Sequence, residues 1–201
     1  MEQQRHMGHE ILYSALLRLL KLLEVSLQPD FPDAQVSLSD FTRSASWQAD
    51  VSHLYLIPHQ VVLNEQGLRP ETTRERYTDE EGEERYRFYR APLPLTLHVL
   101  LVPSTSRSEE HLKLVGRLYQ LLDEQPTLSL ESSEQGQDPA LRISLAADTR
   151  LTSEQLVALF QAGHTVPRLS VPCLIRCLMR SEQILREARP TRSLRGQVQR
   201  T

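Results

Sequence analysis

The segment 90–126 constrains the fold of this chain more than any other, because one secondary structure leads directly into the next. Its first part, RAPLPLTLHVLLV, is apolar enough to lie inside a sheet. A polar turn follows, and HLKLVGRLYQLL then has the apolar spacing of an amphipathic helix. The segment therefore predicts a central strand over 90–102 and a helix that begins after Ser106, with Ser106 and Glu109 as a capping box. The expected core stripe of this helix is Leu112, Val115, Tyr119 and Leu122, widened by Leu114, Leu118 and Leu121.

The rest of the chain alternates between helix-like and strand-like patterns. Leucines at helical spacing predict a first helix that Pro29 ends, and the TSEQ sequence from Thr152 predicts the capping box of a later short helix. Pro58 indicates a bulge or an edge position in a long strand, and Gly82 indicates a turn within the polar excursion 64–84. The expected elements are a helix at 9–27, strands at 34–38, 51–63, 85–90 and 90–102, the helix after Ser106, a strand at 141–145, a helix through Phe160 and a last strand at 168–180.

This order of elements predicts an α+β fold, in which helices pack on one face of a mainly antiparallel or mixed sheet. A length of 201 residues is enough for one domain with tails, and the sequence has no internal repeat. We expect the domain over 9–182. We expect a flexible basic tail over 183–201, because the residues after Arg186 lack a core pattern.

Composition and the termini argue against several classes of protein. The formal net charge of −3 does not fit a globally basic nucleic-acid binder. The N-terminus is polar and contains acids, unlike a signal peptide, and no apolar run is long enough to cross a membrane. The sequence therefore predicts a soluble protein that is made in the cytoplasm and has no membrane partner.

The two cysteines are expected to be separate core thiols. Cys173 and Cys177 lie in an alternating stretch, and strand positions four apart are separated by about 13 Å. A disulfide needs Cα atoms within about 7 Å. A helical CxxxC could instead chelate a metal, but no other cysteine and no cluster of histidines completes such a site.

The sequence has no recognisable catalytic or cofactor-binding motif. The N-terminal HxxHE differs from the zinc-protease patterns. His53 and His59 are about 20 Å apart along a strand and cannot share a metal unless the region of Pro58 folds back. His98 is expected to be a satisfied core or interface histidine, and the acids at 79–84 are expected to form a solvated turn, since they lack EF-hand spacing. We therefore predict no catalytic residue, no cofactor and no metal ion.

Five segments in order carry a resemblance to a known family. They are the leucine-rich helix with its following strand, RAPLPLTLHVLLV with EHLKLVGRLYQLLDEQP, LRISL, LTSEQLVALF and PRLSVPCLIRC. The series resembles the N-terminal domain of cap, or tail-terminator, proteins of extracellular contractile injection systems, which are phage-tail-like particles of the Photorhabdus virulence cassette and antifeeding prophage type. The resemblance covers about 9–182 and lies in the order of the segments.

The resemblance implies a structural role without catalysis. Proteins of this family form a six-fold ring at the end of the tail that is distal to the baseplate, where they end the inner tube and anchor the sheath. For this chain the resemblance implies a homo-oligomeric ring of six copies, with tube and sheath proteins as partners. The protein would be made in the cytoplasm and then become part of a particle that can leave the cell.

The last predicted strand and the arginine-rich C-terminus are the expected contact surfaces. Pro172 suggests that the strand 168–180 lies at an edge that a neighbour can extend. The basic C-terminus fits a solvated tail, an arm that binds an acidic protein, or a nonspecific nucleic-acid contact. The third alternative ranks last, because no interleaved aromatic residues support base stacking. The residues expected to contact a protein are Arg168, Pro172, Arg176, Arg180, Arg186, Arg189, Arg192 and Arg195.

Two other functions stay open at this point. One is a cytoplasmic adaptor whose acidic excursion and basic tail bind separate proteins. The other is a small ligand-binding module or hydrolase with an unrecognised site. A ring in solution or on a tube would favour the cap over both.

Overall fold

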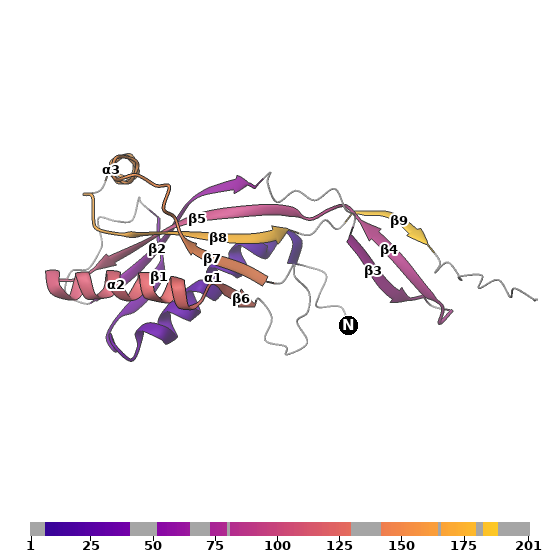
Figure 1. Ribbon diagram of the computed structural model, residues 1–201, viewed down its shortest axis with the longest axis horizontal. Helices are drawn as coiled ribbons and strands as arrows, with labels where there is room; N and C mark the ends of the chain where they lie inside the picture. The colour runs from indigo at the N-terminus through magenta and orange to yellow at the C-terminus, as the bar shows by residue number, and fades with distance from the viewer. Residues whose placement is uncertain are drawn as a thin grey trace, which may run out of the picture.

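The central strand predicted from the sequence lies in the middle of the larger of the two sheets that the structure describes (Figure 1). The computed structural model describes residues 7–40, 52–64, 73–79, 81–129, 142–164, 166–179 and 183–188. In chain order, the elements are α1 (Met7–Leu27), β1 (Gln35–Leu38), β2 (His53–Leu63), β3 (Thr73–Thr78), β4 (Glu84–Tyr89), β5 (Leu93–Ser104), α2 (Ser108–Glu124), β6 (Thr127–Ser129), β7 (Arg142–Ala147), α3 (Ser153–Ala162), β8 (Val171–Met179) and β9 (Ile184–Ala188).

Six strands form one mixed sheet in the order β1-β2-β5-β8-β7-β6. β1 runs parallel to β2, and the other neighbouring pairs are antiparallel. The register of β2 against β5 shifts between Pro58 and Gln60, which confirms the predicted bulge. The α+β fold class with a mainly antiparallel, mixed sheet is confirmed.

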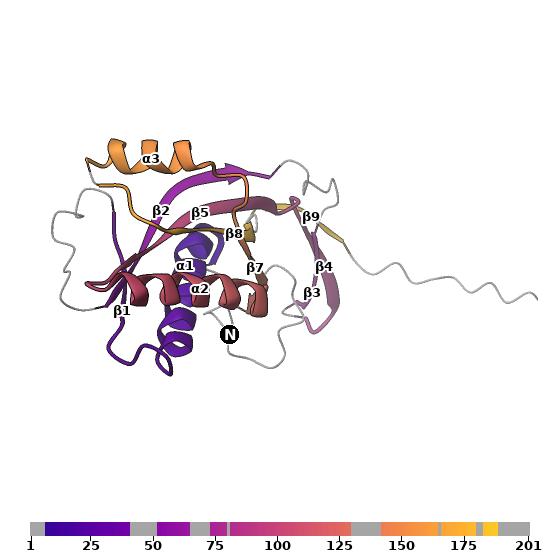
Figure 2. The ribbon, with the colours of Figure 1, turned by 60° about the vertical axis from the view of Figure 1, so that its left-hand side comes forward.

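Helices cover both faces of this sheet, although unequally (Figure 2). α1 and α2 pack together on one face, where the inward side chains of β5 are Leu97, Val99 and Leu101. On the other face α3 places the fully buried Phe160 against a smaller cluster that includes Leu100. The two long helices therefore share one face as predicted, and the short α3 adds a partial layer on the opposite face.

The first helix matches its prediction closely. α1 begins at Met7 and ends at Leu27, two residues before Pro29. Its buried residues repeat at helical spacing, so the leucine stripe is a core face. Within the described residues, no helix combines the length and the apolarity that a membrane span needs. The buried residues of α1 are Ile11, Ala15, Leu16, Leu19, Leu23 and Leu27.

The core face of α2 differs from the predicted one. The helix buries Leu114, Leu118, Leu121 and Leu122, whereas Leu112 is 62% exposed and Tyr119 is 46% exposed. Apolar residues surround much of this helix, so periodicity alone allows two centres for the stripe. Docking against the sheet selects the one that contains Leu118.

The capping boxes have different outcomes in the two later helices. At α3 the prediction is confirmed: Gln155 N–H donates to Thr152 Oγ1 over 3.3 Å, and Thr152 N–H donates to Gln155 Oε1 over 2.9 Å. At α2 the prediction is wrong, because the N-cap is Arg107 and its side chain makes no cap bond. Glu109 pairs instead with Lys113, one turn further along the helix.

β8 is neither the last strand nor an edge strand, which corrects the prediction for 168–180. It lies between β5 and β7, and Pro172 is buried in the sheet. The pairing with β7 begins at Cys173, and Pro172 O accepts the N–H of Asp148 just beyond the end of β7. Pro172 has no N–H to return this bond, so the ladder with β7 ends beside it, and the proline stands where that pairing stops.

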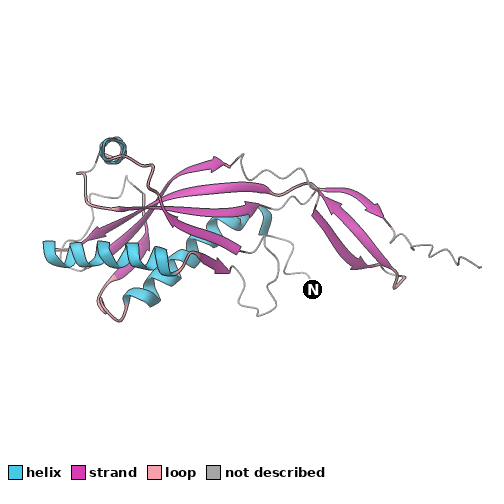
Figure 3. Ribbon diagram, in the orientation of Figure 1, coloured by secondary structure: helices cyan, strands magenta, loops and turns pink. Residues whose placement is uncertain are grey.

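A separate three-stranded sheet, in the order β3-β4-β9, extends away from the main body (Figure 3). Its β3–β4 turn contains Gly82 at a φ of 79°, which confirms the predicted turn, but β3 itself was not expected. Residues 184–188 were expected to belong to a flexible tail, and that part of the prediction is wrong because β9 pairs with β4. Residues 189–201 lie outside the described part of the chain.

Candidate interaction surfaces

The predicted contact residues that the structure describes lie in three separate places. Arg168 donates from Nη1 to Ser104 Oγ over 2.8 Å and so ties the approach to β8 to the end of β5. Arg176 is exposed on the β8 face that points away from α1 and α2. Arg186 lies on β9, and Pro172 is buried, so it presents no surface to a partner. The remaining predicted residues, Arg180, Arg189, Arg192 and Arg195, fall outside the described residues.

The second half of β2 is an edge that the sequence analysis did not single out. β1 pairs only with the residues from His53 to Leu56, and among the described residues no strand pairs with the outer side of β2 beyond them. Val61, Val62 and Leu63 are 50%, 38% and 43% exposed. Edge strands of soluble proteins are usually protected by charges or covered, and this one is apolar. The VVL run after Pro58 was the available signal.

The three-stranded sheet presents arginines stacked on aromatic rings. Arg74 lies 4.5 Å from the ring centroid of Tyr86, and Arg186 lies 4.3 Å from that of Phe88. Neither buried core cluster includes a residue of this sheet. Arginine and aromatic residues are enriched at the centres of protein interfaces. The composition of this sheet therefore fits a contact surface, and Arg186 is the predicted contact residue that it contains.

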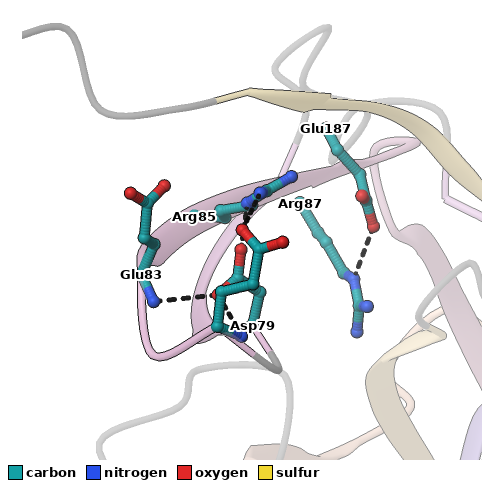
Figure 4. A network of polar contacts seen from close by, with 6 residues as sticks. Asp79, Glu83, Arg85, Arg87 and Glu187 are labelled. Atoms are coloured by element: carbon teal, nitrogen blue, oxygen red, sulfur yellow. Dashed lines mark hydrogen bonds and ion pairs between the residues drawn. The ribbon is translucent and has the colours of Figure 1, made fainter.

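A polar network fixes the tip of the same sheet (Figure 4). Asp79 accepts the backbone N–H groups of Glu83 over 2.8 Å and of Glu81 over 3.0 Å, and Arg85 Nε lies 2.5 Å from its other oxygen. The bond from Glu83 is the largest cause that lowers the pKa of Asp79, and Arg85 also lowers it. The nearby ion pair between Arg87 and Glu187, at 2.8 Å, joins β4 to β9. This network therefore stabilises the β3–β4 turn, and both carboxylate oxygens of Asp79 already contact donors of the same chain.

Two histidines of the six-stranded sheet, His53 and His98, have polar partners, as predicted for His98. His98 Nδ1 lies 3.0 Å from the Oδ2 atom of the buried Asp148. His53 Nε2 lies 2.8 Å from Ser37 Oγ, and its ring stacks on Tyr55 at a centroid distance of 4.2 Å. Burial lowers the pKa of His53. The two contacts link segments that are far apart in the sequence: His53 of β2 with Ser37 of β1, and His98 of β5 with Asp148 just after β7.

Both cysteines are buried free thiols on β8, which confirms the prediction. Burial raises the pKa of Cys173 to about 12 and that of Cys177 to about 11. A thiolate is the reactive form of cysteine, so neither side chain is prepared to act as a nucleophile. Their role is to fill the core between the sheet and its helices.

Comparisons with known proteins identify relatives of this chain. The model of the Pvc16 N-terminal domain family matches residues 16–193. No curated protein sequence matches the chain.

Two solved structures share the fold. One is described as the sheath/tube terminator, in the extended state, of an extracellular contractile injection system; it has a TM-score of 0.61 and 12% identity over 94% of this chain and 63% of its own. The other is described as the tube-terminating cap of the anti-feeding prophage, with a TM-score of 0.60 and 12% identity over 90% of this chain and 60% of its own. This chain thus spans less than two thirds of each of these proteins. Because the family model covers most of the sequence, the chain belongs to the Pvc16 N-terminal domain family.

Proposed function

We propose that this chain is a subunit of the cap that ends the inner tube of a contractile injection particle and anchors the sheath there. The observation that carries this proposal is the family match over residues 16–193, together with a fold shared with two proteins described as tube terminators. The role needs no catalysis, because a ring that covers the exposed end of a tube prevents further subunits from stacking. The chain would be made in the cytoplasm and then join a particle that can leave the cell.

The proposed cap is a closed ring of identical chains, and six copies would match a six-fold tube. Such a ring needs a heterologous contact, in which one surface of a subunit meets a different surface of the next. The outer edge of β2 from Ile57 to Leu63 suits one side of this contact. Among the described residues no strand pairs with this edge beside the exposed Val61 and Leu63, so a strand of the neighbouring subunit can extend the sheet there.

The second proposed contact surface is the three-stranded sheet with the basic residues that follow it. Arg74, Arg76 and Arg186 share one face of this sheet with Tyr86 and Phe88, as the strand registers require. Glu84 offsets part of that charge through its ion pair with Arg76. The remaining charge suits an acidic surface on tube or sheath protein, and Arg189, Arg192 and Arg195 would extend it. Exposed Arg176 on β8 is a further proposed contact.

Binding to purified tubes tests the proposal. Sheathless inner tubes are prepared from a strain that lacks this protein, gold-labelled full-length protein is added, and negative-stain images are scored for the position of the label. We expect label at one end of each tube. Label along the whole tube, or no label at any end, would contradict the cap function.

The β2 contact is tested in the same assay by replacing Val61 and Leu63 with lysine. The matched control is Val157→Lys on α3, which changes an apolar residue that is 37% exposed on another surface. We expect the β2 variant to lose ring formation on tube ends while the control keeps it. Rings of normal appearance with the β2 variant would remove this edge from the account and would leave the cap function intact.

A further inference from the structure

Two histidines from neighbouring strands lie close together on the sheet face that α1 and α2 leave free. The ring centroids of His59 on β2 and His98 on β5 are 5.9 Å apart, and the ring planes make an angle of 60°. These residues are 39 positions apart in the chain, and none of the sequence patterns pairs them. From the sequence, His98 was expected only to have a hydrogen-bond partner in the core or at an interface.

The β-bulge explains how His59 reaches this position. Pro58 pairs with Val99 and Gln60 pairs with His98, so His59 is the extra residue that has no partner across the ladder. A bulge turns the local backbone and redirects the side chain of the extra residue, and bulges are frequent next to functional sites. Here the redirected side chain approaches His98.

Asp148 orients the second histidine. Its Oδ2 lies 3.0 Å from His98 Nδ1, and its Oδ1 accepts the backbone N–H of Arg150 over 3.0 Å. The side chain of Asp148 is 4% exposed, so the carboxylate is held from both sides in a fixed place. A carboxylate oxygen accepts hydrogen bonds, so this contact favours the tautomer of His98 that has the proton on Nδ1 and the lone pair on Nε2. A carboxylate behind a histidine in this way is the usual outer partner of a metal-binding imidazole.

The spacing of the two rings suits one shared ion. A zinc ion lies about 2.0–2.1 Å from a ligating nitrogen and so about 3.2 Å from the ring centroid, which puts two centroids about 5.2 Å apart for a tetrahedral angle and about 6.4 Å apart for a linear one. The observed 5.9 Å falls between these limits. We propose that Nε2 of His98 and the ring of His59 bind one divalent transition-metal ion such as Zn²⁺, with Asp148 as the residue that positions His98.

The chemistry of the ligands selects the ion. Imidazole nitrogens suit zinc, nickel and copper, whereas magnesium and calcium prefer oxygen ligands. Water would complete the coordination, and the ion would join β2 to β5 directly beside the free edge of β2.

Zinc titration of the full-length protein by isothermal calorimetry tests the site. Every sample carries His6→Gln and His9→Gln, because the N-terminal HxxHE could bind metal by itself. We expect one ion per chain, and we expect His59→Gln or His98→Gln to weaken binding by more than about tenfold. The matched control His53→Gln removes a histidine on the same strand as His59 and should leave the affinity unchanged. The absence of binding at about 1 mM zinc, which is the weakest affinity of interest, would overturn the proposal. Binding that survives both substitutions would overturn it as well.

Histidine NMR gives a readout that does not depend on the folding of a variant. Long-range ¹H–¹⁵N spectra of the protein with intact His59 and His98 should show an Nδ1-protonated His98 before zinc is added, and ring nitrogen shifts of both residues afterwards. Asp148→Asn should reduce zinc affinity by about 10- to 100-fold and should change the tautomer balance of His98, which a purely structural role of Asp148 would leave unchanged. Zinc-dependent shifts confined to other histidines would overturn the assignment. Failure of this site would leave the cap function untouched.

Discussion

Two leucines on α2 offer a direct test of how this helix packs. Leu118 is fully buried against the sheet, whereas Leu112 is 62% exposed on the same helix. Leu118→Ala removes the same atoms as Leu112→Ala but leaves a cavity in the core. Leucine-to-alanine changes at buried sites cost about 2–5 kcal/mol, so we expect a loss of about 3 kcal/mol for Leu118→Ala. For Leu112→Ala we expect a change within about 0.5 kcal/mol, because exposed substitutions are nearly neutral and alanine favours the helix.

Urea denaturation followed by circular dichroism measures both variants at one low protein concentration, so that self-association does not contribute. Both variants should keep the m-value of the parent protein, and only Leu118→Ala should lower the midpoint. A loss of about 3 kcal/mol corresponds to a decrease in Tm of roughly 6–12 °C for a domain of this size. Equal losses for the two variants, or a larger loss for Leu112→Ala, would refute the packing of α2 described above and would favour the stripe expected from the sequence.

Three further predictions concern pH, thiol reactivity and backbone conformation. Burial holds the pKa of His53 below its ordinary value of 6.5, so this ring binds a proton less readily in the folded protein than in the unfolded chain. The contribution of His53 to stability should therefore be fully present above pH 6.5 and should be lost as the pH falls below it. His53→Gln should make the decrease in Tm between neutral and acidic pH smaller, and an unchanged pH dependence would contradict the reasoning. Cys173 and Cys177 should resist iodoacetamide at pH 8 in the native protein and react fully in urea, as mass spectrometry would show; rapid native labelling would show that the core is open. Gly82→Ala should destabilise the β3–β4 turn by about 1 kcal/mol, because the φ of Gly82 is positive. The control Gly116→Ala lies in α2 with free space around it and should stabilise the protein by about 0.5–1 kcal/mol. Hydrogen exchange at the turn measures the effect of Gly82→Ala, and unchanged exchange there would contradict the prediction.

The sequence was sufficient to predict those elements whose local pattern has one structural solution. Pro58 required a bulge or an edge, Gly82 required a turn, and the TSEQ sequence at Thr152 fitted one helix start. The alternation around Cys173 likewise fixed a buried strand, because its apolar residues repeat with a period of two. In each case the physical reason acts within a few residues of the signal.

Features that depend on tertiary contacts could not be predicted in the same way. The helix face that contains Leu118 competes with the one that contains Leu112, and only docking on the sheet decides between them. β9 is short and half polar, so its strand state depends on pairing with β4. The interior strand β8 tolerates Pro172 because the pairing with β7 ends beside it, and the sequence of β8 does not reveal this ending.

The candidate contact surfaces follow the same division. Arg186 was predicted from the charge of the C-terminus, and the sheet on which it stacks against Phe88 emerged only from long-range pairing. The free edge of β2 depends on the early end of β1, since β1 pairs only as far as Leu56. The approach of His59 to His98 depends on both the bulge and the neighbouring strand.

The length of the inner tube tests the cap function most directly. Particles are purified from a strain that lacks this protein and from the same strain with the gene restored, and tube lengths are measured in negative-stain images. The account predicts aberrant tube lengths and poorly attached sheath without the protein, and recovery of a uniform length when it is restored. Particles of normal length with intact sheath in the absence of the protein would contradict the cap function.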